Sequence, residues 1–162
     1  MEALNESRDK LWACIAGLTE EQLHRSNGDA WSALENLEHL HLMEHAVSGL
    51  LQQALQAPPG GAVPRVNLES MLDRSNKYNA PPFGQPRGLV QNLDQAKQLL
   101  GESQSALEAV HAAVRQLDHP ETYSMEHPVY GAMNLDQWLE LFALHTLRHL
   151  AQIEQSLSRS NG

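Results

Sequence analysis

Two histidines near the carboxyl end of the chain, His145 and His149, are four residues apart in the stretch LFALHTLRHLAQIEQ. Residues at this spacing lie on one side of a helix, one turn apart, so their imidazoles can bind the same metal ion. Spacing alone is weak evidence, because a chain with nine histidines in 162 residues contains about half of one such pair by chance. Indeed His41 and His45 form a second pair with the same spacing.

The apolar residues around the last pair indicate that its rings face the protein core. His149 follows Phe142 by seven residues and precedes Ile153 by four, which places it within the apolar stripe of the last helix. His145 follows Trp138 by seven and lies on the edge of the same stripe. Burying a polar group without a partner costs a few kcal/mol, so each ring needs a hydrogen bond, a carboxylate or a metal ion.

A third ligand must come from another helix, because catalytic zinc sites usually combine three protein ligands with one open position. His45 falls on the polar side of its helix, and we expect it to be solvated. His39 and His41 border opposite edges of the apolar stripe, and periodicity favours His39 without excluding His41. Glu44 lies within that stripe, either as a hydrogen-bond partner of an imidazole or in a bond to a neighbouring helix.

Three imidazoles suit a divalent metal ion, with zinc or nickel expected before iron or copper. Such an ion would acidify a bound water or thiol and polarise a carbonyl group. We expect Trp31 and Trp138 to pack in the bundle and to form walls of the pocket around the site. Pro128 follows His127 and favours a turn role for this histidine over contact with the mouth of the site. Arg148 is rotated away from the apolar stripe, and we expect it to pair with an acidic residue on another helix.

The elements that must position these residues are helices, since no segment shows the sustained alternation of a half-buried strand. Four long amphipathic helices joined by one or two long connections predict an all-α fold, a four-helix bundle with short extra helical turns. At 162 residues the chain is predicted to form a single domain, residues 1–162. The helical segments are expected at residues 2–17, 19–23, 30–56, 68–77 and 89–117, and from Asn134 onward.

Composition excludes several classes of function. A net charge of -9, from 11 Lys and Arg against 20 Asp and Glu, would repel a phosphate backbone, so we expect no nucleic-acid partner. Cys14 is the only cysteine, which rules out an intrachain disulfide and a zinc finger. No run of apolar residues is long enough to span a membrane, and the first residues do not form a secretion signal. The sequence therefore predicts a cytoplasmic protein with no membrane association.

Two stretches of this chain combine into a specific pattern, AWSALENLEHLHLMEHAV and, far downstream, HPVYGAMNLDQWLELFALHTLRHLAQI with its His-x-x-Arg-His spacing. This pattern resembles the DinB-like (DinB/YfiT) superfamily of four-helix-bundle metalloproteins. With LTEEQL and the APPFGQPRG connection, the resemblance covers nearly the whole chain. One histidine of the second helix and two of the last bind a divalent metal in that family, which implies His39, His145 and His149 as ligands here.

The family includes transferases that use low-molecular-weight thiols, together with members that have no assigned activity. The resemblance therefore implies a metal-dependent thiol S-transferase, whose partners would be a small-molecule thiol and an electrophilic substrate. The alternative is a non-catalytic metal-binding stress or interaction protein. A third possibility is a helical module without metal, whose histidines pair with backbone groups or carboxylates. Because the family is often dimeric, we also expect a homodimer.

Overall fold

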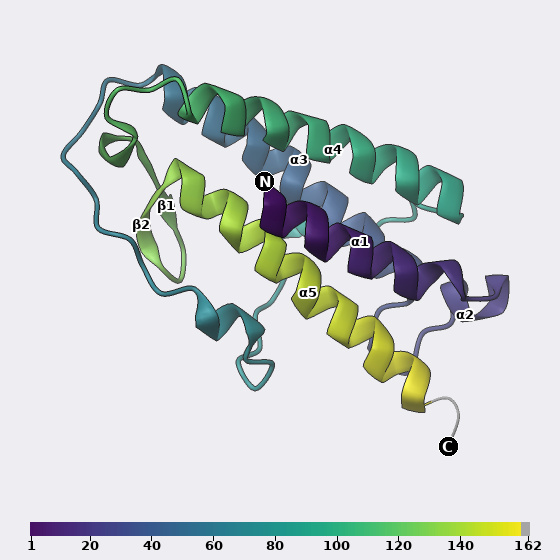
Figure 1. The fold of residues 1–162 in the computed structure, drawn as a ribbon. Helices are drawn as coiled ribbons and strands as arrows, with labels where there is room; N and C mark the ends of the chain where they lie inside the picture. The colour runs from purple at the N-terminus through teal and green to yellow at the C-terminus, as the bar shows by residue number, and fades with distance from the viewer. Residues whose placement is uncertain (160–162) are drawn as a thin grey trace.

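The computed structural model describes residues 1–159, most of which form four long helices (Figure 1). The predicted all-α bundle is confirmed, including a short extra helix between the first two long ones. The helices are α1 (Glu2–Ala16), α2 (Glu20–His24), α3 (Ala33–Gln56), α4 (Leu93–Val114) and α5 (Leu135–Arg159).

Side-chain caps fix where the helices begin. Ser32 Oγ accepts a hydrogen bond from the backbone N–H of Glu35, and the Glu35 carboxylate accepts one from the Ser32 N–H. This capping box satisfies backbone groups that the first helical turn leaves unpaired, so α3 begins after Ser32 and not at Ala30 as expected. Asn92 caps α4 in a similar way, which moves the start of that helix beyond the expected Leu89.

Helices α3 and α4 are parallel neighbours, as their contacts show. The His41 ring donates to the Leu99 carbonyl, and one turn further along both helices Ser103 donates to Glu44. Helices α1 and α5 run in the opposite direction (Figure 1). Two parallel helices that follow each other in sequence require a connection as long as the bundle, and residues 57–92 supply it.

The long connection is anchored to the bundle by buried polar side chains. Gln137 accepts a hydrogen bond from the Val66 N–H and donates to its carbonyl oxygen, as a paired strand would. The Glu38 carboxylate accepts from the N–H groups of Arg87 and Val90. The helix expected at residues 68–77 is reduced to one short 3-10 turn, and the connection contains two such turns, η1 (Glu69–Leu72) and η2 (Pro82–Gly84).

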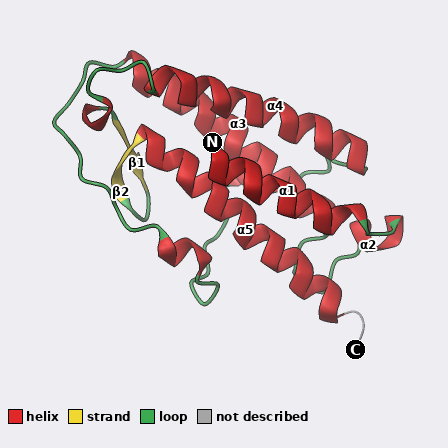
Figure 2. Cartoon of the chain, viewed as in Figure 1, coloured by secondary structure: helices red, strands yellow, loops and turns green. Residues whose placement is uncertain are grey.

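A β-hairpin precedes α5, where the sequence predicted only irregular structure (Figure 2). Its strands are β1 (Ser124–His127) and β2 (Gly131–Asn134), and a further 3-10 turn, η3 (Pro120–Thr122), leads into them. His127 pairs with Gly131, which leaves a three-residue loop between the strands. Gly131 has a φ of 72°, the left-handed conformation that commonly closes such loops.

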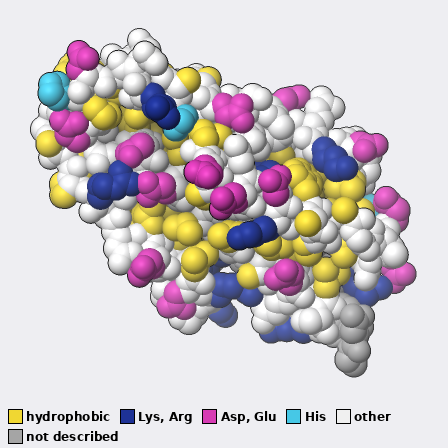
Figure 3. All heavy atoms as spheres, viewed as in Figure 1, with side chains coloured by type: hydrophobic (Ala, Val, Ile, Leu, Met, Phe, Trp, Pro, Cys, Tyr) yellow, Lys and Arg dark blue, Asp and Glu magenta, His cyan; other side chains and the backbone are white. Residues whose placement is uncertain are grey.

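The visible face in Figure 3 carries many scattered acidic side chains between apolar ones, without a continuous basic patch. Exposed Arg65 pairs with Asp136 and Glu140 of α5. No helix within residues 1–159 is long and apolar enough to cross a membrane.

Candidate metal centre

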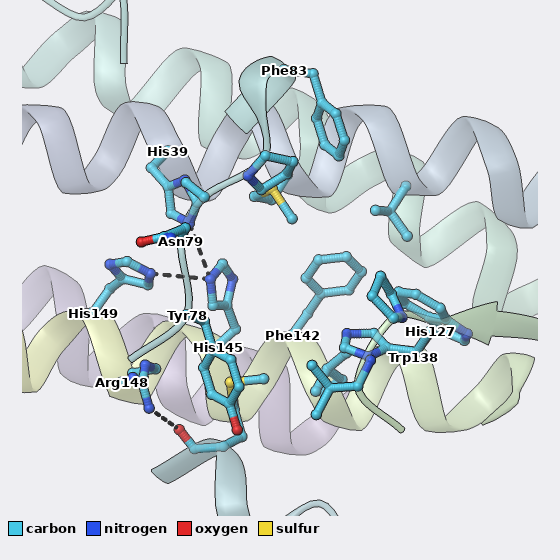
Figure 4. Close-up of a pocket in the computed structure, with 18 of the residues that line it drawn as sticks. His39, Tyr78, Asn79, Phe83, His127, Trp138, Phe142, His145, Arg148 and His149 are labelled. Carbon is cyan, nitrogen blue, oxygen red and sulfur yellow. Dashed lines mark hydrogen bonds between the residues drawn. The ribbon is translucent and has the colours of Figure 1, made fainter. Parts of the chain in front are cut away.

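Helices α3 and α5 bring three imidazoles together inside the bundle (Figure 4). His39 comes from α3 and His145 and His149 come from successive turns of α5. The Nε2 atom of His145 lies 3.2 Å from Nε2 of His39 and 3.0 Å from Nε2 of His149. One nitrogen from each ring can be chosen so that all three lie within 4.8 Å of one another. These are the three residues predicted from the sequence as ligands.

Hydrogen bonds on the far side of two rings fix their tautomers. Nδ1 of His39 lies 2.6 Å from the Gly84 carbonyl oxygen, which can only accept, so this nitrogen carries the proton. Nδ1 of His149 lies 2.7 Å from Oδ1 of Asn36. The Asn36 amide has its nitrogen directed at the Ser32 carbonyl oxygen, so its oxygen accepts from His149. Both rings therefore present an unprotonated Nε2 to His145 when they are neutral.

A proton count shows that this cluster fits a cation. Nε2 of His145 can donate one proton to only one of its two neighbours at a time, so one close contact joins two lone pairs. A positive ion between the rings would remove this repulsion. Metal–nitrogen distances of about 2.0–2.1 Å in a tetrahedral site place ligand nitrogens about 3.3 Å apart, close to the separations observed here. The residues present therefore fit a divalent metal ion.

The electrostatic environment keeps the rings in the form that binds metals. Burial holds the pKa of His145 well below its usual value, and nearby His39 and Arg148 lower it further. Burial also holds the pKa of His149 well below the usual value, with added contributions from the two other imidazoles. For His39, burial lowers the pKa, although its bond to Gly84 acts in the opposite direction. Neutral imidazoles are the metal-binding form.

The other candidates for the third ligand lie elsewhere. His41 is buried on the opposite edge of the stripe, where its Nδ1 donates to the Leu99 carbonyl oxygen at 2.8 Å. His45 is exposed, as expected from its position on the polar side of α3. The structure thus brings His39, and not His41, to the pair on α5.

Glu44 has the structural role that was one of its two expected alternatives. Its carboxylate accepts hydrogen bonds from the Arg8 guanidinium at 2.5 Å and from the Ser103 hydroxyl at 2.9 Å. Glu44 is fully buried and Arg8 is almost fully buried, so the pair links α3 to α1 and α4 within the core. Burial raises the pKa of Glu44, and the adjacent Arg8 partly opposes this shift.

A cavity of about 830 Å³ has the three histidines in its wall. Trp31 and Trp138 also line it, as predicted from the sequence. The remaining walls are mainly apolar and include Met43, Val47, Phe83, Val129, Leu141 and Phe142. Its few polar lining residues include Lys77, Asn79, His127 and Arg148. A small molecule with a large apolar surface would fit this cavity beside the candidate metal centre.

Arg148 holds one wall of the cavity in place. Its guanidinium donates to the carbonyl oxygens of Met71, Asp73 and Asn76 and lies 5.0 Å from the centre of the Tyr78 ring. The prediction that Arg148 pairs with an acidic residue is wrong, because the irregular segment beside α5 offers backbone carbonyl groups that need donors. This arginine therefore fixes the segment that carries Tyr78.

Two residues that support the site were missed in the sequence. Asn36 had a detectable signal, since it is a polar residue four positions before Leu40 on the apolar stripe of α3. Gly84 had none, because its contribution is a backbone carbonyl on a connection whose path the sequence does not specify. Both act by orienting a ligand imidazole, a function that commonly influences metal affinity.

A family model described as the DinB superfamily matches residues 3–153, nearly the whole chain. The chain belongs to the DinB superfamily. The uncharacterized protein YuaE of Bacillus subtilis (strain 168) is 28% identical over 156 residues, which cover 96% of this chain and 95% of YuaE. Together with membership of this superfamily, the group of three histidines suggests a divalent metal ion.

Two solved structures share the fold of this DinB-superfamily chain. TT2238, a four-helix bundle protein, superposes with a TM-score of 0.64 at 20% identity and covers 96% of this chain and 95% of its own. YfiT from Bacillus subtilis, described as a probable metal-dependent hydrolase with an unusual four-helix bundle topology, has a TM-score of 0.58 at 18% identity. That match covers 99% of this chain and 85% of YfiT.

Proposed function

We propose that this protein is a metal-dependent enzyme that attacks an apolar electrophile with a low-molecular-weight thiol. The observation that carries the proposal is the position of the three imidazoles in the wall of an apolar cavity of about 830 Å³. A metal site that only crosslinked the helices of the bundle would need no space for a small molecule beside it. Catalytic metal sites, in contrast, combine three protein ligands with one position left for a nucleophile or substrate.

His39, His145 and His149 would hold the ion, with zinc or nickel as the expected metal. A bound divalent ion lowers the pKa of a thiol or water that it coordinates, which supplies a nucleophile at neutral pH. The protein keeps the ligand rings oriented through the Gly84 carbonyl and the Asn36 side chain. The apolar walls exclude water and hold the electrophile beside the thiol.

In the proposed S-transfer, the thiol proton passes to solvent and the sulfur forms a bond to the electrophilic carbon. The bond from that carbon to the leaving group breaks, and the leaving group departs with the electron pair. The reaction is fast only when the site holds the thiol and the electrophile close together in the reactive orientation. Trp31 contributes to this constraint, since its ring lies 4.9 Å from that of His39 and lines the same cavity.

Hydrolysis is the second candidate, with water in place of the thiol. The likeness in fold to YfiT, described as a probable metal-dependent hydrolase, supports this candidate. Water needs no binding site of its own, so the same cavity could serve an apolar ester or amide. The two candidates share the ligands and the apolar substrate and differ only in the nucleophile.

The test uses full-length protein without a histidine tag, stripped of metal and reloaded with zinc or nickel. We would measure product formation from monochlorobimane with a panel of thiols and, separately, hydrolysis of apolar nitrophenyl esters without thiol. The proposal predicts thiol-dependent turnover that requires metal, disappears in His145→Gln and persists in the exposed control His45→Gln. Metal-dependent ester cleavage alone would establish the hydrolase instead, and no turnover in either assay would favour a non-catalytic metal-binding protein.

A further inference from the structure

His127 lines the same cavity as the candidate metal ligands but approaches it from the hairpin. Figure 4 shows His127 and Trp138 on the opposite side of the pocket from His39 and His149, with Phe142 between the two groups. The histidine cluster and His127 therefore lie on different sides of the cavity, with the apolar ring of Phe142 between them.

Backbone hydrogen bonds determine which nitrogen of His127 carries a proton. Nδ1 lies 3.0 Å from the backbone nitrogen of Val129 and 3.3 Å from that of Tyr130. Both backbone groups can only donate, so Nδ1 is the acceptor and the neutral ring carries its proton on Nε2. Burial lowers the pKa of His127, which favours this neutral form near pH 7. His127 has the turn role predicted for it, but the preference for this role over contact with the site is wrong, because His127 also lines the cavity. The turn bonds leave a defined N–H donor on the other nitrogen.

The ring that carries this donor is held in place. Its centre lies 4.9 Å from the Tyr130 ring and 5.1 Å from the Trp138 ring. Trp138 is itself tied to the hairpin through a bond from its Nε1 to the Met125 carbonyl oxygen. Nε2 of His127 makes no hydrogen bond to any residue in the described part of the chain. A fixed donor that the fold does not use is suited to ligand binding, because little entropy is lost when an acceptor arrives.

We propose that Nε2–H of His127 donates a hydrogen bond to a carbonyl oxygen at the end of the substrate remote from its reacting group. The substrate class is then an elongated molecule with an electrophilic group at the histidine cluster, an apolar middle and a distal carbonyl. Only the position of the electrophile rests on the proposed function. That the distal group is a hydrogen-bond acceptor follows from the tautomer of His127, and a neutral carbonyl suits the mainly apolar walls of the cavity.

Matched hydroxamates test this inference on the zinc-loaded protein by isothermal titration calorimetry. A hydroxamate head binds zinc, and a series of increasing tail length would end either in a methyl ketone or in the alkyl chain of equal length. One hydrogen bond to a neutral group contributes about 1 kcal/mol, so the ketone should bind about fivefold more tightly at the tail length that reaches His127.

The variants His127→Asn and His127→Gln separate binding from the turn. In His127→Asn, the side-chain oxygen can replace Nδ1 as acceptor of the turn N–H groups, but the amide N–H groups lie near the position of Cδ2 and do not reach that of Nε2–H. The preference for the ketone, measured as the ratio of the two hydroxamate affinities, should disappear in this variant, because loss of the ring's apolar surface affects both ligands alike. His127→Gln should retain a donor and lose the turn acceptor, which lowers thermal stability.

A second arm needs no metal. A long-chain methyl ketone without hydroxamate should shift the Nε2 and Hε2 resonances of His127 in nitrogen-15 spectra of both metal-free and zinc-loaded protein. No shift, or a ketone preference that survives in His127→Asn, would overturn the inference. Hydroxamate affinity that is the same with and without zinc would instead contradict the proposed metal site, whatever the His127 resonances show.

Discussion

Asn36 should set the metal affinity although it cannot touch the metal itself. Its side-chain oxygen accepts the Nδ1–H of His149 at 2.7 Å, and its nitrogen donates to the Ser32 carbonyl oxygen at 2.9 Å. Replacement by leucine keeps a similar volume but removes both bonds and a third, weaker one from the Asn36 nitrogen to the Trp31 carbonyl oxygen. His149 is then buried with an unpaired N–H, since only 4% of its surface is exposed.

The expected loss can be estimated from these contacts. Removing a hydrogen-bond partner of a ligand histidine typically lowers metal affinity 10- to 100-fold, or about 1.4–2.7 kcal/mol. We expect Asn36→Leu to fall within this range. Metal binding makes the Nδ1–H of His149 more acidic, so its bond to Asn36 is stronger in the metal-bound state than in the free state. Part of the stability loss, about 1–3 kcal/mol for an unpaired buried donor, falls on both states and does not change the affinity.

The assay is competition with a chromogenic zinc chelator at pH 7.5, on tag-free protein whose folding is verified by circular dichroism. Asn36→Asp is the matched control, because a carboxylate still accepts from His149 but no longer donates to the Ser32 carbonyl. We expect this variant to bind zinc at least as tightly as wild type while melting at a lower temperature. The reasoning would be refuted if Asn36→Leu bound zinc as tightly as wild type, or if both variants lost affinity equally.

Three further predictions concern stability and the wall of the site. First, the metal-free protein should lose stability as the pH falls below about 6.5, by up to about 1.4 kcal/mol per pH unit for each of His145 and His149. The pKa values of these two histidines are lowered in the folded protein, so the unfolded chain binds more protons in this pH range. Urea denaturation at several pH values measures this slope, which should be smaller in His149→Gln. Second, Glu44→Ala should lower the free energy of unfolding by about 3–5 kcal/mol, because it leaves Arg8 buried without its partner. In the same denaturation assay, a double variant that also carries Arg8→Met should recover part of this loss. Third, Gly84→Ala should weaken zinc binding severalfold in the chelator assay. The added carbon would lie 2.6 Å from Sδ of Met43 and 3.4 Å from Nδ1 of His39, and so would crowd the bond between that nitrogen and the Gly84 carbonyl. Unchanged affinity would contradict this role.

The sequence was sufficient to predict the four long helices and the buried face of the last one, because apolar periodicity reports burial directly. His149 illustrates this, since its place between Phe142 and Ile153 predicted a buried ring, and the structure leaves 4% of its surface exposed. Periodicity could not decide between His39 and His41, which border opposite edges of one stripe. That choice depends on how α3 is rotated relative to α5, which is a property of the tertiary packing.

Features that depend on irregular backbone could not be predicted from the sequence. The hairpin strands are four residues each, too short for an alternating pattern to emerge from Ser124–His127 or Gly131–Asn134. Arg148 binds backbone carbonyl oxygens, so no residue type could have marked its partners in advance. The same holds for Gly84, whose contribution to the site is a carbonyl group. The cavity itself depends on the path of the connection between α3 and α4.

His39, His145 and His149 are expected to bind one divalent metal ion together. The most direct measurement is elemental analysis by mass spectrometry of tag-free protein, dialysed and compared with His39→Asn, His145→Asn and His149→Asn. We predict about one ion per chain in wild type and in the control variants His41→Asn and His45→Asn, and well under half of that in each of the three ligand variants. Metal content that is unchanged in all three, or lost in His41→Asn and kept in His39→Asn, would contradict the account.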